Sequence, residues 1–229
     1  MVVLRDLRKD YGEADVVRRI LDGVSASIGR GEFVVVLGRS GSGKSTLLNL
    51  IAGMDQPTRG EVHVGGARID TLSDRDRTLY RRRSIGFVFQ FFNLLLTLTV
   101  EENVLLPLEL CGTLDNRTRQ AAKELLADVG LIDRLSSFPD RLSGGEQQRL
   151  AIARSLVHEP ELLLADEPTG NLDIETGEEV LGLLDRLVRQ RGRTLIMATH
   201  SREIAATADR VLEIRDGQLQ ARHTSTRPC

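Results

Sequence analysis

The sequence predicts an α/β fold with parallel strands at its centre. Two short apolar runs, at residues 33–37 and 162–165, have the length and composition of strands that are buried on both faces. Each run is followed by a loop rich in glycine or charge, and then by residues with helical periodicity. Strands that alternate with helices along the chain are typical of a parallel sheet covered by helices.

The first half of the chain supplies most of the predicted strands. A glycine-rich loop at 38–46 leads into a helical pattern that stops at Gly53. A short polar helix is expected to end near the arginine triplet 81–83, where cations suit the helix dipole. Strands are expected at 2–7, 24–28, 33–37, 61–64 and 85–89.

The second half begins with a change in the spacing of apolar residues. From residue 100 to about 141, apolar residues recur at helical spacing without β-branched runs, which predicts a helical insertion. Helices are then expected at 150–157, 180–188 and 202–208, and strands at 162–165, 194–198 and 211–214. The tail at 222–229 has no periodicity.

Composition excludes several classes of protein. Of the 229 residues 41% are hydrophobic, so a buried core is expected, and 31 Lys and Arg against 33 Asp and Glu give a net charge of −2. Such a balance argues against nucleic-acid binding, and no apolar run approaches the ~18 residues of a membrane helix. Two distant cysteines, Cys111 and Cys229, cannot build a disulfide framework or a four-cysteine zinc site. We expect a protein of the reducing cytosol.

The loop at 38–46 fits the phosphate-loop pattern G-x-x-x-x-G-K-[ST]. Its glycines allow successive N–H groups to face nucleotide phosphates, Lys44 would neutralise their charge, and Ser45 would ligate Mg²⁺. A chance flexible loop is the alternative, but the strand before it and the helix after it are the context that the pattern requires. The candidate phosphate-binding residues are Gly38, Arg39, Ser40, Gly41, Ser42, Gly43, Lys44, Ser45 and Thr46.

A second candidate anion site precedes a predicted helix at residues 142–148, LSGGEQQ. A serine hydroxyl and glycine N–H groups at a helix N-terminus can bind an anion. Alternatively, Ser143 and Glu146 form a capping box, which explains the start of the helix but not the poor helix formers Gly144 and Gly145.

Two carboxylates, Asp166 and Glu167, follow the apolar run 162–165. They stand at the carboxyl end of a predicted strand, which is where parallel α/β sheets bind ligands. The alternative is a solvated acidic turn ahead of a helix.

Together, the three motifs resemble those of the ATP-binding cassette (ABC) ATPases, over residues 4–219. The resemblance implies a P-loop NTPase fold of ABC type: a mixed sheet core, an N-terminal antiparallel β subdomain and an inserted α-helical subdomain. It implies one ATP-binding domain at 1–229. The core and β subdomain would take up 1–99 and 142–221, the helical subdomain 100–157, and the tail 222–229.

The resemblance also implies roles for single residues. ATP and Mg²⁺ would be the cofactors, with Ser45, Gln90 and Asp166 at the metal. Glu167 would polarise the attacking water and His200 would contact the γ-phosphate. Gln90 would report that phosphate to the partner.

Three further assignments come from the resemblance. Tyr11 would stack on adenine, although a packing role is the alternative. Asn171 and Asp173 would lie in a loop that crosses a dimer interface. Ser143, Gly144, Gly145 and Glu146 would complete the site of a second copy.

The texture of 82–95 and 165–173 resembles the lipoprotein-release and macrolide-export branch, with Leu96 where that branch has proline. It implies a homodimer that hydrolyses ATP for a separate membrane permease. The homodimer would bind that permease at the cytoplasmic face of the membrane, and an extracytoplasmic adaptor could bind the other side of the permease. The work could be export, lipoprotein extraction or mechanical signalling. The alternative, a soluble ABC ATPase of DNA repair or translation, normally has a coiled coil, zinc cysteines or a second cassette. A P-loop kinase or GTPase leaves 142–148 unexplained.

Overall fold

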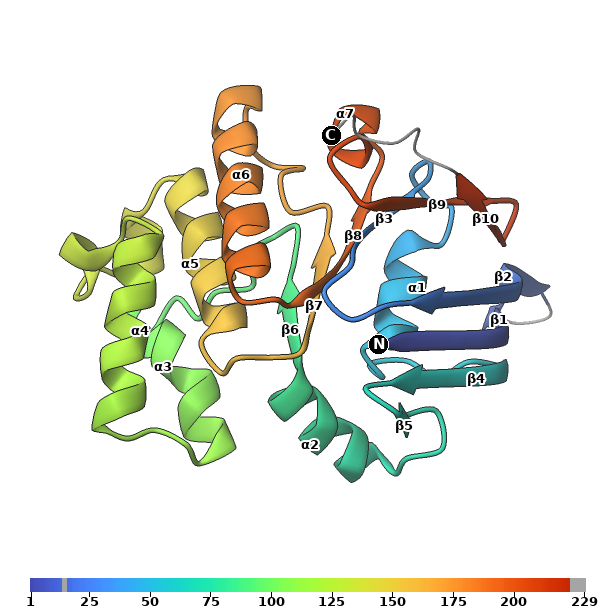
Figure 1. Cartoon of the computed structure of the whole chain (residues 1–229), viewed down its shortest axis with the longest axis horizontal. Coiled ribbons are helices and arrows are strands. Elements are labelled where there is room, and N and C mark those ends of the chain that lie inside the picture. The colour runs from blue at the N-terminus through green and yellow to red at the C-terminus, as the bar shows by residue number, and fades with distance from the viewer. Residues whose placement is uncertain (14–15, 223–229) are drawn as a thin grey trace. The chain divides into compact units, whose positions relative to one another are not determined.

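The computed structural model of the chain describes residues 1–13 and 16–222. Residues 223–229, with Cys229 and most of the predicted tail, lie outside the described residues. Two compact units are present, and we describe each by itself. Unit 1 contains residues 1–81 and the chain from 193 onward, and unit 2 contains residues 82–192 (Figure 1).

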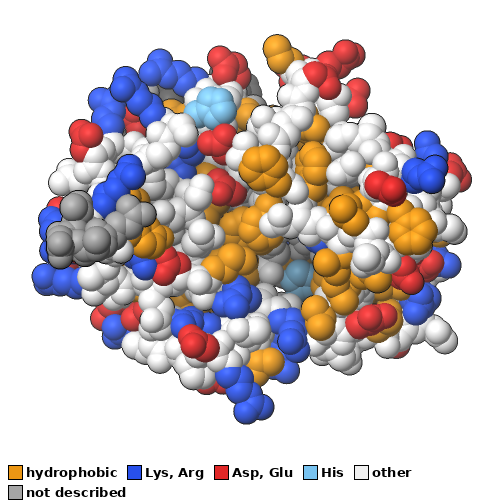
Figure 2. Space-filling view, turned by 180° about the vertical axis from the view of Figure 1, so that it is seen from behind, with side chains coloured by type: hydrophobic (Ala, Val, Ile, Leu, Met, Phe, Trp, Pro, Cys, Tyr) orange, Lys and Arg blue, Asp and Glu red, His pale blue; other side chains and the backbone are white. Residues whose placement is uncertain are grey.

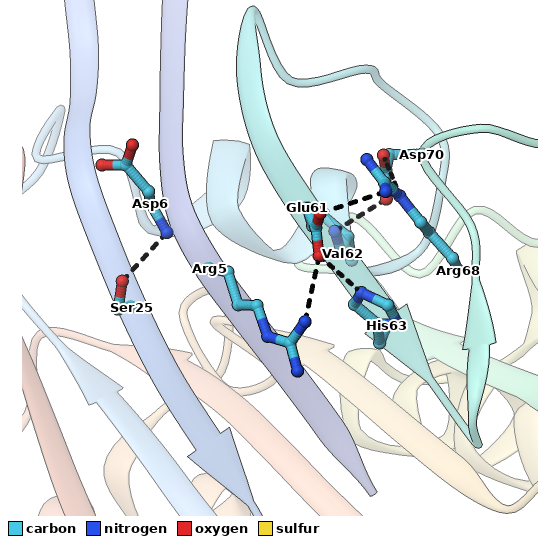
Figure 3. A network of polar contacts seen from close by, with 8 residues as sticks. All are labelled: Arg5, Asp6, Ser25, Glu61, Val62, His63, Arg68 and Asp70. Carbon is cyan, nitrogen blue, oxygen red and sulfur yellow. Dashed lines mark hydrogen bonds and ion pairs between the residues drawn. The ribbon is translucent and has the colours of Figure 1, made fainter.

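Unit 1 contains an antiparallel sheet in the order β2-β1-β4-β5. Its strands are β1 (Val2–Glu13), β2 (Val16–Ile28), β4 (Arg59–Val64) and β5 (Ala67–Arg68). Val2 pairs with both Ile28 and Val64, and all three side chains are buried. Alternation along the strands puts polar side chains on the other face, where Glu61 accepts hydrogen bonds from Arg5 and pairs with His63 (Figure 3).

Unit 1 also contains parallel strands that position the phosphate loop. β3 (Phe33–Leu37) lies between β8 (Thr194–Thr199) and β9 (Arg210–Arg215), and β10 (Gln218–Arg222) pairs antiparallel with β9. All five residues of β3 are buried, as its apolar run predicts. Leu37 is in register with Thr199, so the loops after β3 and β8 leave the same edge of these strands. Helix α1 (Lys44–Ile51) packs against β8 and β4, and a short α7 (Arg202–Ala205) follows β8.

Unit 2 joins two parallel strands to a group of helices. The strands are β6 (Ile85–Val88) and β7 (Leu162–Asp166), with Val88 in register with Ala165. The helices are α3 (Val100–Cys111), α4 (Asn116–Asp128), α5 (Gly144–Leu156) and α6 (Ile174–Gln190), with single 3-10 turns at Ile132–Arg134 and Pro139–Arg141. The chain enters this unit within α2 (Asp74–Ser84). α5 contacts α3, α4, α6 and β6, and is therefore the centre of this unit.

Short polar residues define where these helices begin. Thr99, Asp115 and Ser143 each accept a hydrogen bond from the N–H three residues later, in a full capping box, and Asp173 caps α6 in the same way with its carboxylate. Such a cap contributes about 1 kcal/mol to helix stability. The caps explain two differences from the sequence prediction, since α5 begins at Gly144 and α6 at Ile174, earlier than the apolar periodicity indicates.

The predicted α/β class with parallel central strands is confirmed. The sequence underestimated the hairpin of β1 and β2, which extends beyond the expected 2–7 and 24–28, and it missed β10. Both differences concern strands that contain many charged or polar residues and no regular alternation of apolar ones. In such segments hydrogen bonding to a neighbouring strand, and not apolar periodicity, decides the structure. None of the described helices is long and apolar enough to cross a membrane.

Candidate functional site

The phosphate loop in unit 1 is closed by its own lysine. Lys44, the first residue of α1, is 5% exposed, and its ammonium donates hydrogen bonds to the carbonyl oxygens of Gly38 at 3.0 Å and Arg39 at 3.1 Å. Gly43 has a φ of 101°, and a Cβ atom there would lie 2.9 Å from Cγ2 of Ile20. This position therefore requires glycine, both for its backbone angle and for the close approach of β2.

The loop has the features of an anion site. Helix α1 begins without a side-chain cap and without an acidic residue in its first turn, so its positive end stays uncompensated beside the Lys44 ammonium. The buried hydroxyl of Ser42 has no hydrogen-bond partner among the described residues. A buried donor of this kind is satisfied by a ligand or by water. The structure thus fits the predicted binding of phosphate groups by residues 38–46.

His200 lies next to this loop. It directly follows β8, and the N–H of Gly38 donates to the carbonyl oxygen of Thr199 at 3.3 Å. A cavity of about 770 Å³ opens between the loop and His200. Its other walls are the β2 residues Arg18, Arg19 and Ile20, Arg202, and the hairpin residues 213–217. Five arginines in this lining, against the two acidic residues Glu213 and Asp216, favour an anionic ligand.

Tyr11 also lies in unit 1, near the end of β1. The residue is 42% exposed and its hydroxyl donates to Asp55 at 2.6 Å. The side chain of Thr46, in the phosphate loop, lies near this hydroxyl, so the predicted adenine contact stands beside the predicted phosphate site.

The carboxylates lie in unit 2, at the carboxyl ends of β6 and β7. Asp166 ends β7, and Glu167 follows with a φ of 44°, a left-handed conformation that costs a non-glycine residue about 1–3 kcal/mol. The amide of Asn171 donates to the carbonyl oxygen of Gln90 at 2.8 Å, and a Cβ atom on Gly170 would lie 2.9 Å from Nε2 of Gln90. Gln90 and the turn after Glu167 are therefore in contact, as the parallel register of the two strands predicts.

A clamp holds the loop that follows Gln90. Phe92 and Asn93 both have left-handed backbones, with φ values of 58° and 50°. The Arg154 guanidinium of α5 donates to the carbonyl oxygens of Asn93 at 2.7 Å and Phe92 at 3.0 Å. Burial lowers the pKa of Arg154 from its ordinary value, but the group stays a cation at neutral pH. Sequence reasoning missed this residue, because nothing in its spacing points to a loop 61 residues away.

The motif at 143–146 forms the capping box considered from the sequence. The Ser143 hydroxyl accepts from the Glu146 N–H at 3.3 Å, and the Glu146 carboxylate accepts from the Ser143 N–H at 2.8 Å. The backbone hydrogen bond from Ser143 holds the pKa of Glu146 below its usual range, against the opposing effect of burial. The Ser143 side chain also interacts with the Glu146 carboxylate, which lowers the pKa of Glu146 further.

The two glycines of this motif have a packing reason as well. A Cβ atom on Gly145 would lie 2.5 Å from Cγ2 of Thr176, and one on Gly144 would lie 3.4 Å from Cδ2 of Leu172. The close approach belongs to the loop and helix that Asp173 caps, where backbone hydrogen bonds lower the pKa of that carboxyl. Glycine is thus required here by helix packing even without a ligand.

The structure brings the candidates together in two groups. Tyr11, residues 38–46 and His200 meet in unit 1, whereas Gln90, Asp166, Glu167, residues 143–146 and Asp173 belong to unit 2. Among the described residues no group of three or more His, Cys, Asp or Glu could hold a metal. Mg²⁺ in nucleotide sites needs only one or two protein carboxylates, because phosphate oxygens and water supply the other ligands.

Comparison with known proteins agrees with this geometry. The family model described as ABC transporter matches residues 21–170. An ABC transporter ATP-binding protein of Mycobacterium tuberculosis is 53% identical over 96% of this chain and 88% of its own length. The lipoprotein-releasing system ATP-binding protein LolD of Geobacter metallireducens is 45% identical over 96% and 98%. The macrolide export protein MacB of Hyphomonas neptunium is 45% identical over 96% of this chain but only 34% of its own length.

Solved structures give the same result. A dimeric ATP-binding cassette in a post-hydrolysis state, bound to ADP and phosphate, superposes with a TM-score of 0.88 at 41% identity, over 96% of this chain and 97% of that one. A dimeric bacterial ABC transporter cassette has the same TM-score at 42% identity. The predicted family, fold and ATPase activity are confirmed: the chain belongs to the ABC transporter family, as an ATP-binding cassette ATPase similar to the lipoprotein-release and macrolide-export proteins.

Proposed function

We propose that this cassette works as a homodimer, binds two Mg²⁺–ATP between its copies, and drives a separate membrane permease by hydrolysing them. The observation that carries the proposal is the phosphate loop closed by Lys44, whose ammonium is fixed at two carbonyl oxygens. A buried ammonium beside the uncapped N-terminus of α1 favours an anionic ligand such as a phosphate group.

The proposal assigns a role in ATP binding to each of the candidate residues. The N–H groups of 38–46 and the Lys44 ammonium bind the β- and γ-phosphates, and His200 contacts the γ-phosphate. Ser45, Gln90 and Asp166 would hold Mg²⁺, which when bound neutralises charge that develops on the phosphate oxygens. Their hydroxyl, amide and carboxylate oxygens are the hard ligands that this ion prefers.

Hydrolysis depends on Glu167. In the proposed step a water oxygen bonds to the γ-phosphorus while the bond from that phosphorus to the bridging oxygen breaks, which releases ADP. Glu167 orients the water and accepts its proton, and its left-handed backbone ends the extended path of β7. Strained conformations of this kind persist where function needs them.

A second copy would complete each site. Ser143 and Gly145 stand at the start of α5, where the Ser143 hydroxyl would donate to a γ-phosphate oxygen of the other copy. The dimeric state of the two solved cassettes supports this arrangement. Asp173, beside the highly exposed Ile174, would then lie at the dimer interface.

Exposed apolar side chains on unit 2 support a permease partner. Among them are Phe91, Leu95, Leu96 and Leu110, which are 72%, 43%, 63% and 51% exposed. Hydrophobic side chains gather on the surface of this unit in Figure 2. Exposed clusters of this kind mark interaction sites, and Leu96 adds apolar area where the branch has proline. The cytoplasmic face of a permease is the partner that we propose for this surface.

Isothermal titration of ATP into Lys44→Ala tests the function. We expect the folded variant to lose tight ATP binding, because the ammonium fixed at the Gly38 and Arg39 carbonyl oxygens is removed. Lys123→Ala is the matched control, since that lysine lies on α4 beside Glu101 and should leave ATP affinity unchanged. Unaltered ATP affinity in folded Lys44→Ala would contradict the proposal.

A further inference from the structure

Three side chains of unit 1 form a closed group around the Tyr11 ring. The Tyr11 hydroxyl donates to one carboxylate oxygen of Asp55 at 2.6 Å, and the Lys9 ammonium donates to the other at 2.5 Å. Lys9 also donates to the carbonyl oxygen of Gln56 at 2.8 Å. No spacing in the sequence indicates this group, because Asp55 is 44 residues from Tyr11.

The Lys9 ammonium covers one face of the ring. It lies 4.7 Å from the ring centroid, within the range of a cation–π contact. Lys9 is 9% exposed whereas Tyr11 is 42% exposed, so part of Tyr11 stays accessible beside the buried ammonium. The ring face opposite the ammonium is the one on which a planar ligand would stack.

The same group ties the ring to the phosphate loop. Asp55 comes just after α1, and its N–H donates to the carbonyl oxygen of Asn49 in that helix. Thr46, in the first turn of α1, lies near the Tyr11 hydroxyl. The ring is therefore tied to the helix that carries the phosphate site.

The charges of the group hold this geometry at neutral pH. Burial opposes ionisation of Asp55, but hydrogen bonds from Lys9 and Tyr11 prevail and lower its pKa. Burial and the Asp55 carboxylate raise the pKa of Tyr11 from 10.0, so its hydroxyl remains a donor. Both partners are thus in the protonation state that the hydrogen bond requires.

We propose that Lys9 and Asp55 are positioning residues that preset the Tyr11 ring as a stacking platform for the adenine of ATP. The inference rests on the proposed function, because the phosphate loop must bind the triphosphate of the same nucleotide. Stacking on a free side chain would first have to order it, whereas the two hydrogen bonds and the ammonium have already done so. The group acts on the base and not on the phosphates.

The test compares Mg²⁺–ATP with inorganic tripolyphosphate, which has no base, by calorimetric titration of folded protein. Tyr11→Ala should bind ATP about 5- to 150-fold more weakly, the range found when a base-stacking aromatic is removed. Asp55→Ala should give a smaller loss, of about 3- to 10-fold, since the ring remains but is no longer held. Tripolyphosphate affinity should be unchanged in both variants.

Tyr11→Phe provides a second variant that leaves Asp55 and Lys9 in place. It removes only the hydroxyl, so it should match Asp55→Ala, and the double variant should be no weaker than either single one. Glu61→Ala is the control, because this carboxylate has three partners in the same antiparallel sheet and none of them is Tyr11.

Three results would overturn the inference: an equal loss for both ligands in Asp55→Ala, no loss for ATP in Asp55→Ala and Tyr11→Phe, or unchanged ATP affinity in Tyr11→Ala. Failure of the proposed function would look different, because the wild-type protein would then bind neither ATP nor tripolyphosphate.

Discussion

Replacing Glu167 by glutamine should convert the cassette into a stable ATP-bound dimer. Glutamine has the same length and shape and tolerates the left-handed backbone as well as glutamate does, so the φ of 44° should be kept. The carbonyl oxygen can still accept a hydrogen bond from water, but the amide cannot take its proton. Only the chemical step should therefore be affected.

The expected magnitude follows from that loss. Removing a general base lowers the rate about 10²- to 10⁴-fold, which corresponds to about 2.7–5.4 kcal/mol in the activation barrier. Lys44 keeps its two hydrogen bonds to the loop carbonyls, 3.0 and 3.1 Å long, since no contact of the phosphate loop changes. ATP should then remain bound for long enough to hold two copies together.

Size-exclusion chromatography with light scattering, with a parallel phosphate-release assay, measures both effects. Glu167→Gln should be a dimer in Mg²⁺–ATP and a monomer in ADP, and adding Ser143→Arg should abolish the dimer by placing bulk at the start of α5. Glu178→Gln, an exposed position on α6, is the matched control and should behave as wild type. A Glu167→Gln protein that stays monomeric in saturating ATP and hydrolyses it at the wild-type rate would refute both the role of Glu167 and the shared site.

Three further predictions concern the framework of unit 2. Arg154→Met should lower the free energy of unfolding in urea by about 2 kcal/mol, because two loop carbonyl oxygens lose a charged donor. Arg154→Lys should lower it less. Equal stability of the wild type and both variants would contradict the clamp. Gly145→Ala should lower the free energy of unfolding by about 1–3 kcal/mol in the same measurement. Adding Thr176→Ser, which removes the clashing methyl group, should restore most of this loss. An unchanged unfolding midpoint for Gly145→Ala would show that the Thr176 side chain moves aside without cost. Burial lowers the pKa of His158 from 6.5, so the unfolded chain binds this proton more readily and stability should fall as the pH drops below about 6.5. His158→Gln should flatten that part of the stability profile, and an unaltered profile would exclude His158 as its source.

The sequence by itself determined the central strands, the phosphate loop and the position of the carboxylates. These features rest on interactions between residues close together in the sequence. The five apolar residues of β3 are buried, and the glycines of the phosphate loop allow its backbone conformation. Ser143 caps the helix that begins at the next residue. Structure that depends on such local patterns can be predicted from sequence, because the interacting residues are close together along the chain.

Tertiary structure alone decided which distant residues meet. No sequence signal predicts three of these contacts, since the residues of each pair are far apart along the chain. They are the hydrogen bond of the Tyr11 hydroxyl to Asp55, that of Arg154 to the loop after Gln90, and the close approach of Thr176 to Gly145. The length of the β1–β2 hairpin and the presence of β10 were likewise set by strand pairing and not by periodicity. The physical reason is that side-chain contacts between separate elements depend on packing distances of a few ångströms, which no spacing along the chain encodes.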